Sequence, residues 1–479
     1  MGATLALVTF GCSAPKTKFP HNVVAIHPDG TLYRLSGQTD RKGRSKLVKR
    51  SSPTSQAERE SYRETTRKHL SYIFENNPEL DKQQTVLLFI QGGLNDVKDG
   101  TARADRLTEA ILKDTNSPAY PIFIAWDANL ISAWGEQYTT HRGLDDKAFG
   151  IVLAPLTFTA NLGRLLSRLP FSTFEQGYAG MRTLRAPCYG GGTNEPHWIP
   201  RPEQANQQYD ILLSTNYSVQ FEPGQKSWTL PARGVLMLFE AIPKVLCGAI
   251  VDTGGKAGWD FMLRRTKTMF TLSRSLDRGG MDFFGEELVK YMRAHPNKRL
   301  VIVGHSMGSI VANELIRRFG DQLTNLDIVY MAAACGVDDF DHVVIPHLLK
   351  HPETTFYNLS LHPGNDISEL PCPWWAELLT PRGSLLDWID FYYSSTDTEY
   401  GWTLGKWDNA IIGSKRFLSQ QLPENQEKLK KQVHFKNFGY GPELEYGPQH
   451  HGGFDQWKFW EPAFWKLGTY DTNWYYGPP

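Results

Sequence analysis

The sequence predicts an α/β fold with a mostly parallel, doubly wound sheet. Continuous apolar runs of strand length recur along the chain, for example at 85–90 and 121–126. Such runs are typical of strands buried on both faces of a parallel sheet. Segments with helical spacing of apolar residues separate the runs, so we expect strands joined by right-handed crossover helices.

The expected elements follow in order along the chain. Strands are expected at 23–26, 31–34, 85–90, 121–126, 300–303, 326–331, 355–361 and 432–435, and helices at 55–75, 102–113, 281–295 and 309–319. A Pro-Asp-Gly turn at 28–30 predicts that the first two strands form an antiparallel hairpin. The basic segment 41–53 is expected to be a solvated loop rather than a binding patch, because charge runs are usually exposed.

The chain is long enough for one α/β core with large insertions. Between about 132 and 266 the alternation of strands and helices stops, and the Pro and Gly content indicates an insertion or cap. We therefore expect an anchor or signal segment, a first part of the core, this insertion, a second part of the core, an aromatic-rich cap and a final core strand with a histidine loop. Their boundaries are 1–20, 21–131, 132–266, 267–370, 371–430 and 431–479.

The composition bears on nucleic-acid binding and on the role of the tryptophans. The chain has 51 Lys and Arg and 51 Asp and Glu, so no global field attracts nucleic acid, which we do not expect as a partner. Tryptophans gather late in the chain, where they form either ordinary core or an apolar substrate site. They are Trp374, Trp375, Trp388, Trp402, Trp407, Trp457, Trp460 and Trp465.

The amino terminus reads as an export signal. A short apolar run at 5–11 precedes Cys12, and this pattern resembles the lipobox of bacterial lipoproteins. The resemblance implies that Cys12 is lipidated and that the protein attaches to the cell envelope, as a periplasmic or outer-membrane lipoprotein. Thr9 departs from the usual leucine, and no Lys or Arg precedes the run. The alternatives are a buried first strand or a disordered tail, with a cytoplasmic location.

No segment of the sequence reads as an ordinary transmembrane helix. The most apolar stretch, 234–251, is interrupted by Glu240, Pro243 and Lys244. The other cysteines lie far apart without metal-type spacing, so they are either disulfide-bonded or free buried thiols. They are Cys188, Cys247, Cys335 and Cys372.

The pentapeptide Gly-His-Ser-Met-Gly at 304–308 is the most informative motif. It lies between the apolar run 300–303 and the amphipathic stretch 309–319, so Ser306 stands at a sharp turn from strand to helix. A side chain at either glycine would collide with the neighbouring strand or helix, and the strained serine would project its hydroxyl outward. Ser306 is therefore expected to be a nucleophile.

A serine hydroxyl needs a base, and the base needs an acid to orient it. In this architecture the acid and then the histidine follow the serine, on loops at the carboxyl ends of strands. Asp366 comes after the strand at 355–361 and is the first choice for the acid, with the pair Asp338 and Asp339 as alternatives. His451 is preferred as the base over His450, because it directly precedes two glycines.

The oxyanion of the reaction needs backbone donors. Met307, directly after the nucleophile, supplies one N–H, and the loop after the strand at 85–90 should supply the other. Glycines in that loop allow close approach to a substrate, so Gly93 is the first choice and Leu94 the second.

These segments together resemble the α/β-hydrolase superfamily, and within it a group of serine hydrolases of the esterase or lipase type. The resemblance rests on 89–92, 124–126, 304–308 and 451–454, and covers the core rather than the insertions. Gln91 replaces the histidine that commonly precedes the oxyanion glycine, which puts the loop geometry in doubt rather than the reaction.

The resemblance implies hydrolysis of a carboxylic ester through an acyl-enzyme on Ser306. The apolar and aromatic content of the expected caps favours a lipid-like ester. Neither a metal nor another cofactor is expected, since no third ligand accompanies the histidine pair. An acyltransferase would use the same triad, and a non-catalytic protein with this fold would bind a lipid or partner. The sequence does not indicate the oligomeric state.

Overall fold

The protein was examined as a computed structural model. The structure describes residues 14–49, 53, 55–75, 77–116, 119–129, 255–256, 258–272, 277–362, 365–366, 369, 383–393, 402–438, 447–466 and 474–476, together with 159, 163, 166–167 and 170. The predicted insertion at 132–266 and residues 371–382 of the predicted cap lie almost wholly outside this part of the chain, as does Cys12.

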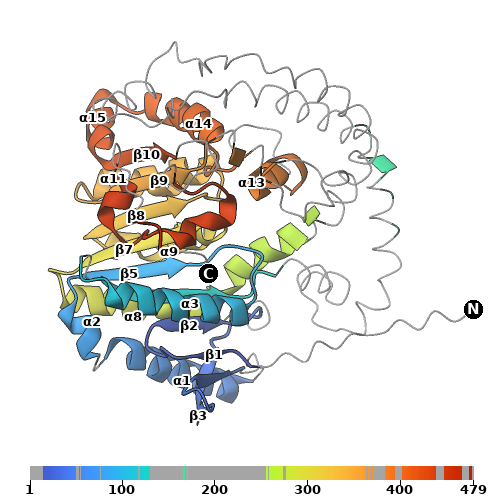
Figure 1. Ribbon diagram of the computed structural model, residues 1–479, viewed down its shortest axis with the longest axis vertical. Coiled ribbons are helices and arrows are strands. Elements are labelled where there is room, and N and C mark those ends of the chain that lie inside the picture. Colours follow the sequence, from blue (N-terminus) through green and yellow to red (C-terminus); the bar gives the residue numbers. More distant parts are fainter. Residues whose placement is uncertain are drawn as a thin grey trace, which may run out of the picture.

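A seven-stranded sheet forms the core. Its strand order is β10-β9-β8-β7-β5-β6-β2, and every neighbouring pair is parallel. Figure 1 shows the strands stacked from β2 at the bottom to β10 at the top. The strands are β2 (Val23–Ile26), β5 (Thr85–Ile90), β6 (Ala119–Trp126), β7 (Arg299–His305), β8 (Leu326–Met331), β9 (Thr355–Ser360) and β10 (Val433–Asn437). The α/β class and the parallel sheet predicted from the apolar runs are confirmed.

Helices cover this sheet. They are α1 (Gln56–Phe74), α2 (Pro78–Lys82), α3 (Val97–Lys113), α8 (Gly280–Ala294), α9 (Gly308–Phe319), α10 (Val337–Asp339), α11 (Ile345–Lys350), α13 (Leu385–Trp388), α14 (Trp407–Ser419), α15 (Pro423–Gln432) and α16 (Pro462–Trp465). Shorter or wider turns are η3 (Gly320–Gln322), η4 (Phe340–Val344), η6 (Ile389–Tyr393) and η9 (His451–Gln456). The four predicted helices are all present, and α3 begins earlier than predicted because Asp96 caps it.

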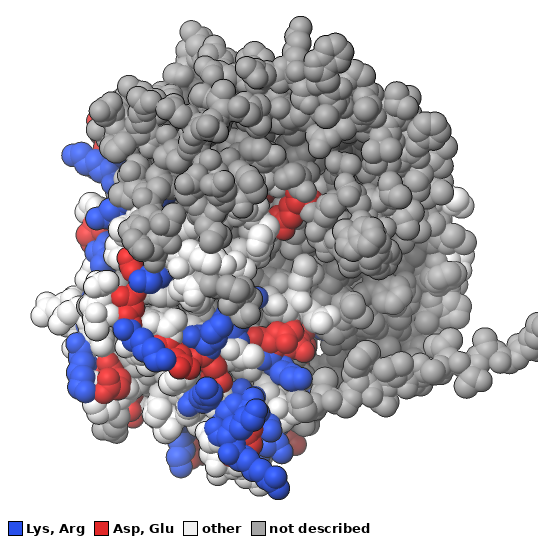
Figure 2. Space-filling model, viewed as in Figure 1, with Lys and Arg blue, Asp and Glu red and all other residues white. Residues whose placement is uncertain are grey.

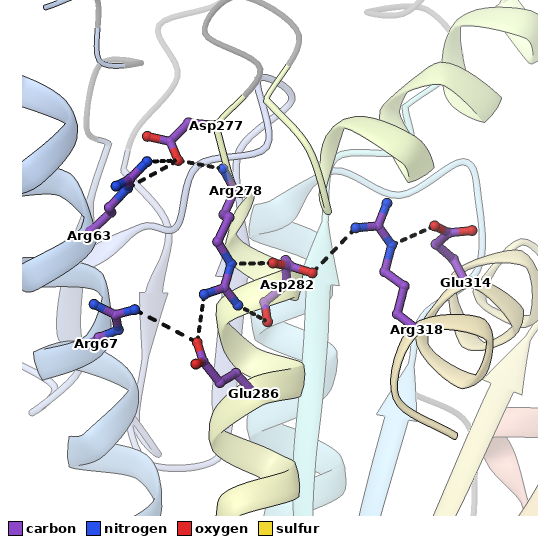
Figure 3. Close-up of polar contacts among 8 residues, drawn as sticks. All are labelled: Arg63, Arg67, Asp277, Arg278, Asp282, Glu286, Glu314 and Arg318. Carbon is purple, nitrogen blue, oxygen red and sulfur yellow. Dashed lines mark hydrogen bonds and ion pairs between the residues drawn. The ribbon is translucent and has the colours of Figure 1, made fainter. Parts of the chain in front are cut away.

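Paired charges join α1, α8 and α9 (Figure 3). Arg278, two residues before α8, donates to Asp282 and Glu286 on that helix. Arg318 of α9 donates to both Asp282 and Glu314. Arg63 of α1 donates to the buried carboxylate of Asp277. Each of these cations has its counter-charge within the network, so this surface is a structural tie between helices rather than a free binding site.

A second, smaller sheet corrects two predictions. β3 (Arg34–Thr39) follows β2 after a turn at 27–30, but it leaves the hairpin after a single bridge and pairs with β4 (Ser45–Val48). β1 (Lys16–Thr17) completes the order β1-β4-β3, all antiparallel. β2 instead joins the large sheet parallel to β6. The segment 41–53, predicted to be a loop, therefore contains a strand, because Leu47 is buried against the core.

The order of the strands places a switch point between β5 and β7. From β5 the chain crosses to β6 on one side, whereas β7, β8, β9 and β10 follow on the other side. In open α/β sheets, ligands bind outside the carboxyl ends of the strands at such a point. The segments that leave β5 and β7 at this edge are the loop with Gly92 and Gly93 and the turn with Ser306.

The late tryptophans that the structure describes are mostly part of the core. Trp388, Trp407, Trp457, Trp460 and Trp465 are all buried. Ring contacts such as that between Trp457 and Phe464 connect the carboxyl-terminal segment internally, and Phe459 packs on Phe89 of β5. Core packing therefore accounts for these five, while Trp374 and Trp375 lie outside the described residues.

Cys335 is a buried free thiol, and burial raises its pKa. The other cysteines of the sequence are not among the described residues. In the described part of the chain, no helix is long and apolar enough to cross a membrane.

The central strand β5 provides a test of the core. Leu88 is fully buried between β6 and β7, so Leu88→Ala should lower the free energy of unfolding by about 2 to 5 kcal/mol. Leu112→Ala, at a position on α3 that is 42% exposed, should cost less than about 1 kcal/mol. Urea unfolding measures both variants, and equal losses would contradict the assigned core.

Candidate active site

Ser306 occupies the strained turn predicted from the sequence. Its φ of 50° lies in the left-handed region, which a residue with a side chain rarely adopts. A Cβ at Gly308 would lie 2.1 Å from the carbonyl oxygen of Ile90, and one at Gly304 would lie 2.8 Å from Cα of Ser309. The predicted collisions with the neighbouring strand and helix are confirmed, so both glycines are required by close backbone approach.

The backbone of Ser306 is fixed by hydrogen bonds on both sides. Its N–H donates to the carbonyl of Met331 (2.9 Å), at the end of the adjacent strand β8. Its carbonyl accepts from the N–H of Ala334 (3.1 Å) and from the N–H and hydroxyl of Ser309 (3.1 and 2.7 Å). The turn is therefore held rigidly, as a strained conformation requires.

The loop after β5 lies directly against this turn. A Cβ at Gly92 would come within 2.8 Å of Cβ of Ser306, and a Cβ at Gly93 within 2.8 Å of Sδ of Met307. Gln91 orders the loop, because its side chain donates to the carbonyl of Trp126 (2.7 Å) and its own carbonyl accepts from the Trp126 indole (3.0 Å). The residue that departs from the hydrolase pattern thus has a structural role here.

Two backbone N–H groups at this junction are unused. Neither Gly93 nor Met307 donates its N–H to any described residue. Leu94, the second choice from the sequence, has a φ of 69° and donates its N–H to the carbonyl of Ala128 (2.8 Å). Gly93 and Met307 are therefore the pair available to hold an oxyanion.

His451 lies at the start of η9 beside the elbow. Its ring is buried, and its centroid lies 5.5 Å from that of His305, the residue before Ser306. His305 Nε2 lies 3.0 Å from the carbonyl oxygen of His451, which fixes the backbone of the histidine loop to the nucleophile strand. His450 is exposed, so of the two histidines His451 is the one that faces the elbow.

A buried ion pair fastens the same loop to α3. Asp455, four residues after His451, forms an ion pair with Arg103 (2.9 Å) and lies 3.6 Å from Arg106. Tyr476 also donates to the backbone carbonyl of Asp455. Breaking such a pair would leave a buried charge without its partner, so the loop has a single preferred position.

The segment that carries Asp366 touches the histidine loop at two places. Glu369 accepts the backbone N–H of His451 (2.8 Å), and the amide of Asn365 donates to Gln449 (2.9 Å). Asp366 itself is buried, beside Asp387 and Lys406. The structure thus brings the proposed acid, base and nucleophile into one region at the carboxyl edge of the sheet.

The electrostatics of this region favour neutral groups. Burial lowers the pKa of His451 to about 3, with smaller contributions from His305 and His450. Burial and then the negative charge of Asp387 raise the pKa of Asp366 well above its ordinary value. Burial likewise raises the pKa of Glu369 to about 7. A buried neutral imidazole can accept a proton, as a general base must.

The reactive atoms of the three residues are unpaired. Ser306 Oγ, both ring nitrogens of His451 and Asp366 Oδ1 are buried without a hydrogen-bond partner in the described part of the protein. No hydrogen bond joins the three side chains to one another. Buried polar atoms are normally paired, and unpaired ones are often found at catalytic sites.

The alternative acids lie elsewhere. Asp339 is 3.5 Å from Arg317 at the end of α9, and burial raises its pKa to about 6. Asp338 shares the short helix α10 with it, and neither has a contact with His451. No group of three His, Cys, Asp or Glu side chains that could bind a metal occurs among the described residues.

Three residues of the site were not identified from the sequence. His305 lies inside the elbow motif, but its role as an anchor depends on a loop 146 residues later. The one sequence signal for Glu369 and Asp455 is that they lie close in sequence to Asp366 and His451. Their contacts are with backbone atoms and with distant arginines, which no local pattern reveals.

Comparison of the chain with family models, curated proteins and solved structures gave no match. The likeness to α/β-hydrolases therefore rests on the motif, the parallel sheet and the arrangement at the switch point.

The close approach at Gly308 predicts a large effect on stability. Gly308→Ala places Cβ against the backbone of Ile90, which cannot move without displacing β5. The substitution should therefore lower the free energy of unfolding by about 3 kcal/mol or prevent folding. Gly43→Ala, at φ 71° with no atom near, should cost only about 1 to 2 kcal/mol. Urea denaturation compares the two, and similar costs would show that the elbow is looser than described.

Glu369 predicts a pH dependence of stability. Between its ordinary pKa of 4.5 and its folded pKa of about 7, the folded protein holds a proton that the unfolded chain has lost. The contribution of Glu369 to the free energy of unfolding should therefore fall by about 3 kcal/mol as the pH rises through this window, and Glu369→Gln should lack that contribution. Urea unfolding at several pH values measures the difference between the two proteins.

The matched control is Glu60→Gln on the exposed side of α1, which should keep the pH dependence of the wild type. Parallel pH curves for wild type and Glu369→Gln would mean that this carboxyl is not perturbed by burial.

Proposed function

We propose that this protein is a serine hydrolase of the α/β-hydrolase type, which cleaves a carboxylic ester through an acyl-enzyme on Ser306. The observation that carries the proposal is the set of unpaired atoms at the switch point. The hydroxyl of Ser306, the ring nitrogens of His451 and one oxygen of Asp366 are all buried without partners. The N–H groups of Gly93 and Met307 beside them are also unused.

In the proposed reaction, Ser306 Oγ attacks the ester carbonyl while His451 accepts the hydroxyl proton. The negative charge that develops on the carbonyl oxygen is held by the N–H groups of Gly93 and Met307. The His451 imidazolium then gives its proton to the leaving alkoxide, and the acyl group remains on the serine. Water, deprotonated by His451, attacks the acyl-enzyme, and the acid is released with Ser306 regenerated.

Asp366 is the proposed orienting acid. Burial and the charge of Asp387 raise the pKa of its carboxyl, and an imidazolium on His451 would provide the positive charge that favours its ionised form. Side-chain rotation in a substrate complex would bring these groups into hydrogen-bond contact, as catalytic hydrogen bonds are often long or absent without substrate. Glu369, His305 and Asp455 hold the loop that carries the base.

The proposed location follows from Cys12. Lipidation of this cysteine would attach the enzyme to the cell envelope, where a lipid-like ester is a suitable substrate class. Loss of a metabolically incorporated palmitate analogue in Cys12→Ala would support this attachment, and labelling that persists in the variant would contradict it.

A fluorophosphonate probe tests the nucleophile. Wild type should be labelled covalently and Ser306→Ala should not, because the probe reacts with an activated serine hydroxyl. Hydrolysis of a short-chain nitrophenyl ester should fall by roughly 10⁴-fold or more in kcat/KM. Ser61→Ala, an exposed serine on α1, serves as the matched control and should behave as wild type. Undiminished labelling of Ser306→Ala would refute the proposal.

Product analysis separates hydrolysis from acyl transfer. Addition of a primary alcohol to the assay should give mainly the free acid from a hydrolase, whereas predominance of the new ester would identify an acyltransferase that uses the same residues.

A further inference from the structure

The small sheet β1-β4-β3 carries a concentration of positive charge that the balanced net charge of the chain conceals. Residues 14–49 contain eight Lys and Arg and only two Asp. The cations are Lys16, Lys18, Arg34, Arg41, Lys42, Arg44, Lys46 and Lys49. Figure 2 shows Lys and Arg gathered over the lower part of the molecule, where Figure 1 places β1 and β3. We call the surface formed by these eight side chains the basic face.

Most of this charge has no counter-charge among the described residues. Lys16 and Arg44 both pair with Asp40, and Lys18 lies 3.9 Å from Glu109. The other five form no ion pair with any described residue. They are Arg34, Arg41, Lys42, Lys46 and Lys49. This contrasts with the network of α1, α8 and α9, where the arginines have carboxylate partners.

The strand register makes the accumulation costly in the absence of anions. Lys16 of β1 lies directly opposite Lys46 of β4, and like charges opposite each other on neighbouring strands are destabilising. Leu47 and its partner Leu35 face the core, so the alternation of the strands places Arg34 and Lys46 on the outer side. An external anionic surface would relieve this repulsion.

A depression beside the sheet offers room for anionic groups. It has a volume of about 430 Å³ and is lined by Lys16, Lys18, Arg44 and Lys98 together with Asp105 and Glu109, among others. Lys98 comes from the first turn of α3 and has no ion-pair partner in the described chain. The basic face is thus continuous with a hollow large enough for a phosphate group.

We propose that the basic face docks on a membrane surface rich in anionic phospholipid. Clusters of four to eight Lys and Arg are typical of such docking, with about 1 kcal/mol for each charge near the surface. The position of the segment at Pro15 favours a lipid surface over other polyanions as the binding partner. The carbonyl of Pro15 accepts from the N–H of Leu47 in β4, so the chain enters the fold at this face. Cys12, the predicted lipidation site, is only three residues earlier in the sequence, so a lipid anchor there would hold the basic face close to the bilayer surface.

Binding to vesicles tests this proposal without any reference to ester hydrolysis. The full chain with Cys12→Ala, which excludes an acyl contribution, should sediment with phosphatidylcholine vesicles that contain about 30% phosphatidylglycerol and not with pure phosphatidylcholine. Raising the salt from about 0.05 to 0.5 M should weaken the binding, because exposed charges are screened.

Neutralising the basic face should abolish most of the binding. Lys42→Gln, Lys46→Gln and Lys49→Gln combined in the same background should lower the partition coefficient by about 100-fold. The matched control combines Lys428→Gln, Lys430→Gln and Lys431→Gln on α15, at the opposite end of the molecule in Figure 1, and should bind as its parent does. Circular dichroism tests whether each variant folds. If the triple variant does not fold, the double variant Arg34→Gln with Arg41→Gln takes its place.

Three results would overturn the proposal. The first is equal binding of the parent to both kinds of vesicle, and the second is equal loss of binding in the basic-face and α15 variants. The third is tighter binding to a short duplex DNA than to the anionic vesicles, lost in the basic-face variant, which would assign the surface to nucleic acid instead.

Discussion

The contact between the backbone of β5 and the first residue of α9 governs the arrangement of the site. Gly308 approaches the carbonyl of Ile90 so closely that no side chain fits between them. This approach presses the loop at Gly92 and Gly93 against the elbow and sets their backbone beside Ser306 and Met307. The unused N–H groups and the strained serine thus result from one packing constraint between the end of β5 and the start of α9, reinforced by the three hydrogen bonds that the Ser306 carbonyl accepts.

The remaining parts of the site are fastened to this centre from three directions. His305 holds the histidine loop from the nucleophile strand, Asp455 holds it from α3, and Glu369 holds it from the segment after β9. All three contacts act on the backbone or on a neighbour of His451 and leave its ring nitrogens unpaired. The protein therefore fixes where the imidazole is while leaving its reactive atoms available.

Much of this architecture was predictable because its signals are local. The runs at 85–90, 300–303 and 326–331 are buried on both faces, and their apolar character alone identified them as parallel strands. The elbow was recognisable because its motif, the apolar run before it and the helical spacing after it are neighbours in sequence. The contact that requires Gly308 is not local, since its partner Ile90 belongs to a distant strand. Ser309, Met331 and Ala334 complete that turn by hydrogen bonds, but these use backbone atoms or a small hydroxyl, which leave little trace in sequence. The strand at Ser45–Val48 was missed because it is short, lies in a basic segment and has Leu47 as its single buried residue.

The separation between His305 and the carbonyl on which it docks has a consequence for biosynthesis. His305 is added 146 residues before the ribosome reaches His451, so the elbow and the β5 loop are synthesised well before the histidine loop. A nascent polypeptide that has already folded this much carries the strained serine but not the imidazole beside it. Under the proposed mechanism, the chemistry is switched on only when the carboxyl-terminal segment docks, so truncated translation products would be inert rather than uncontrolled.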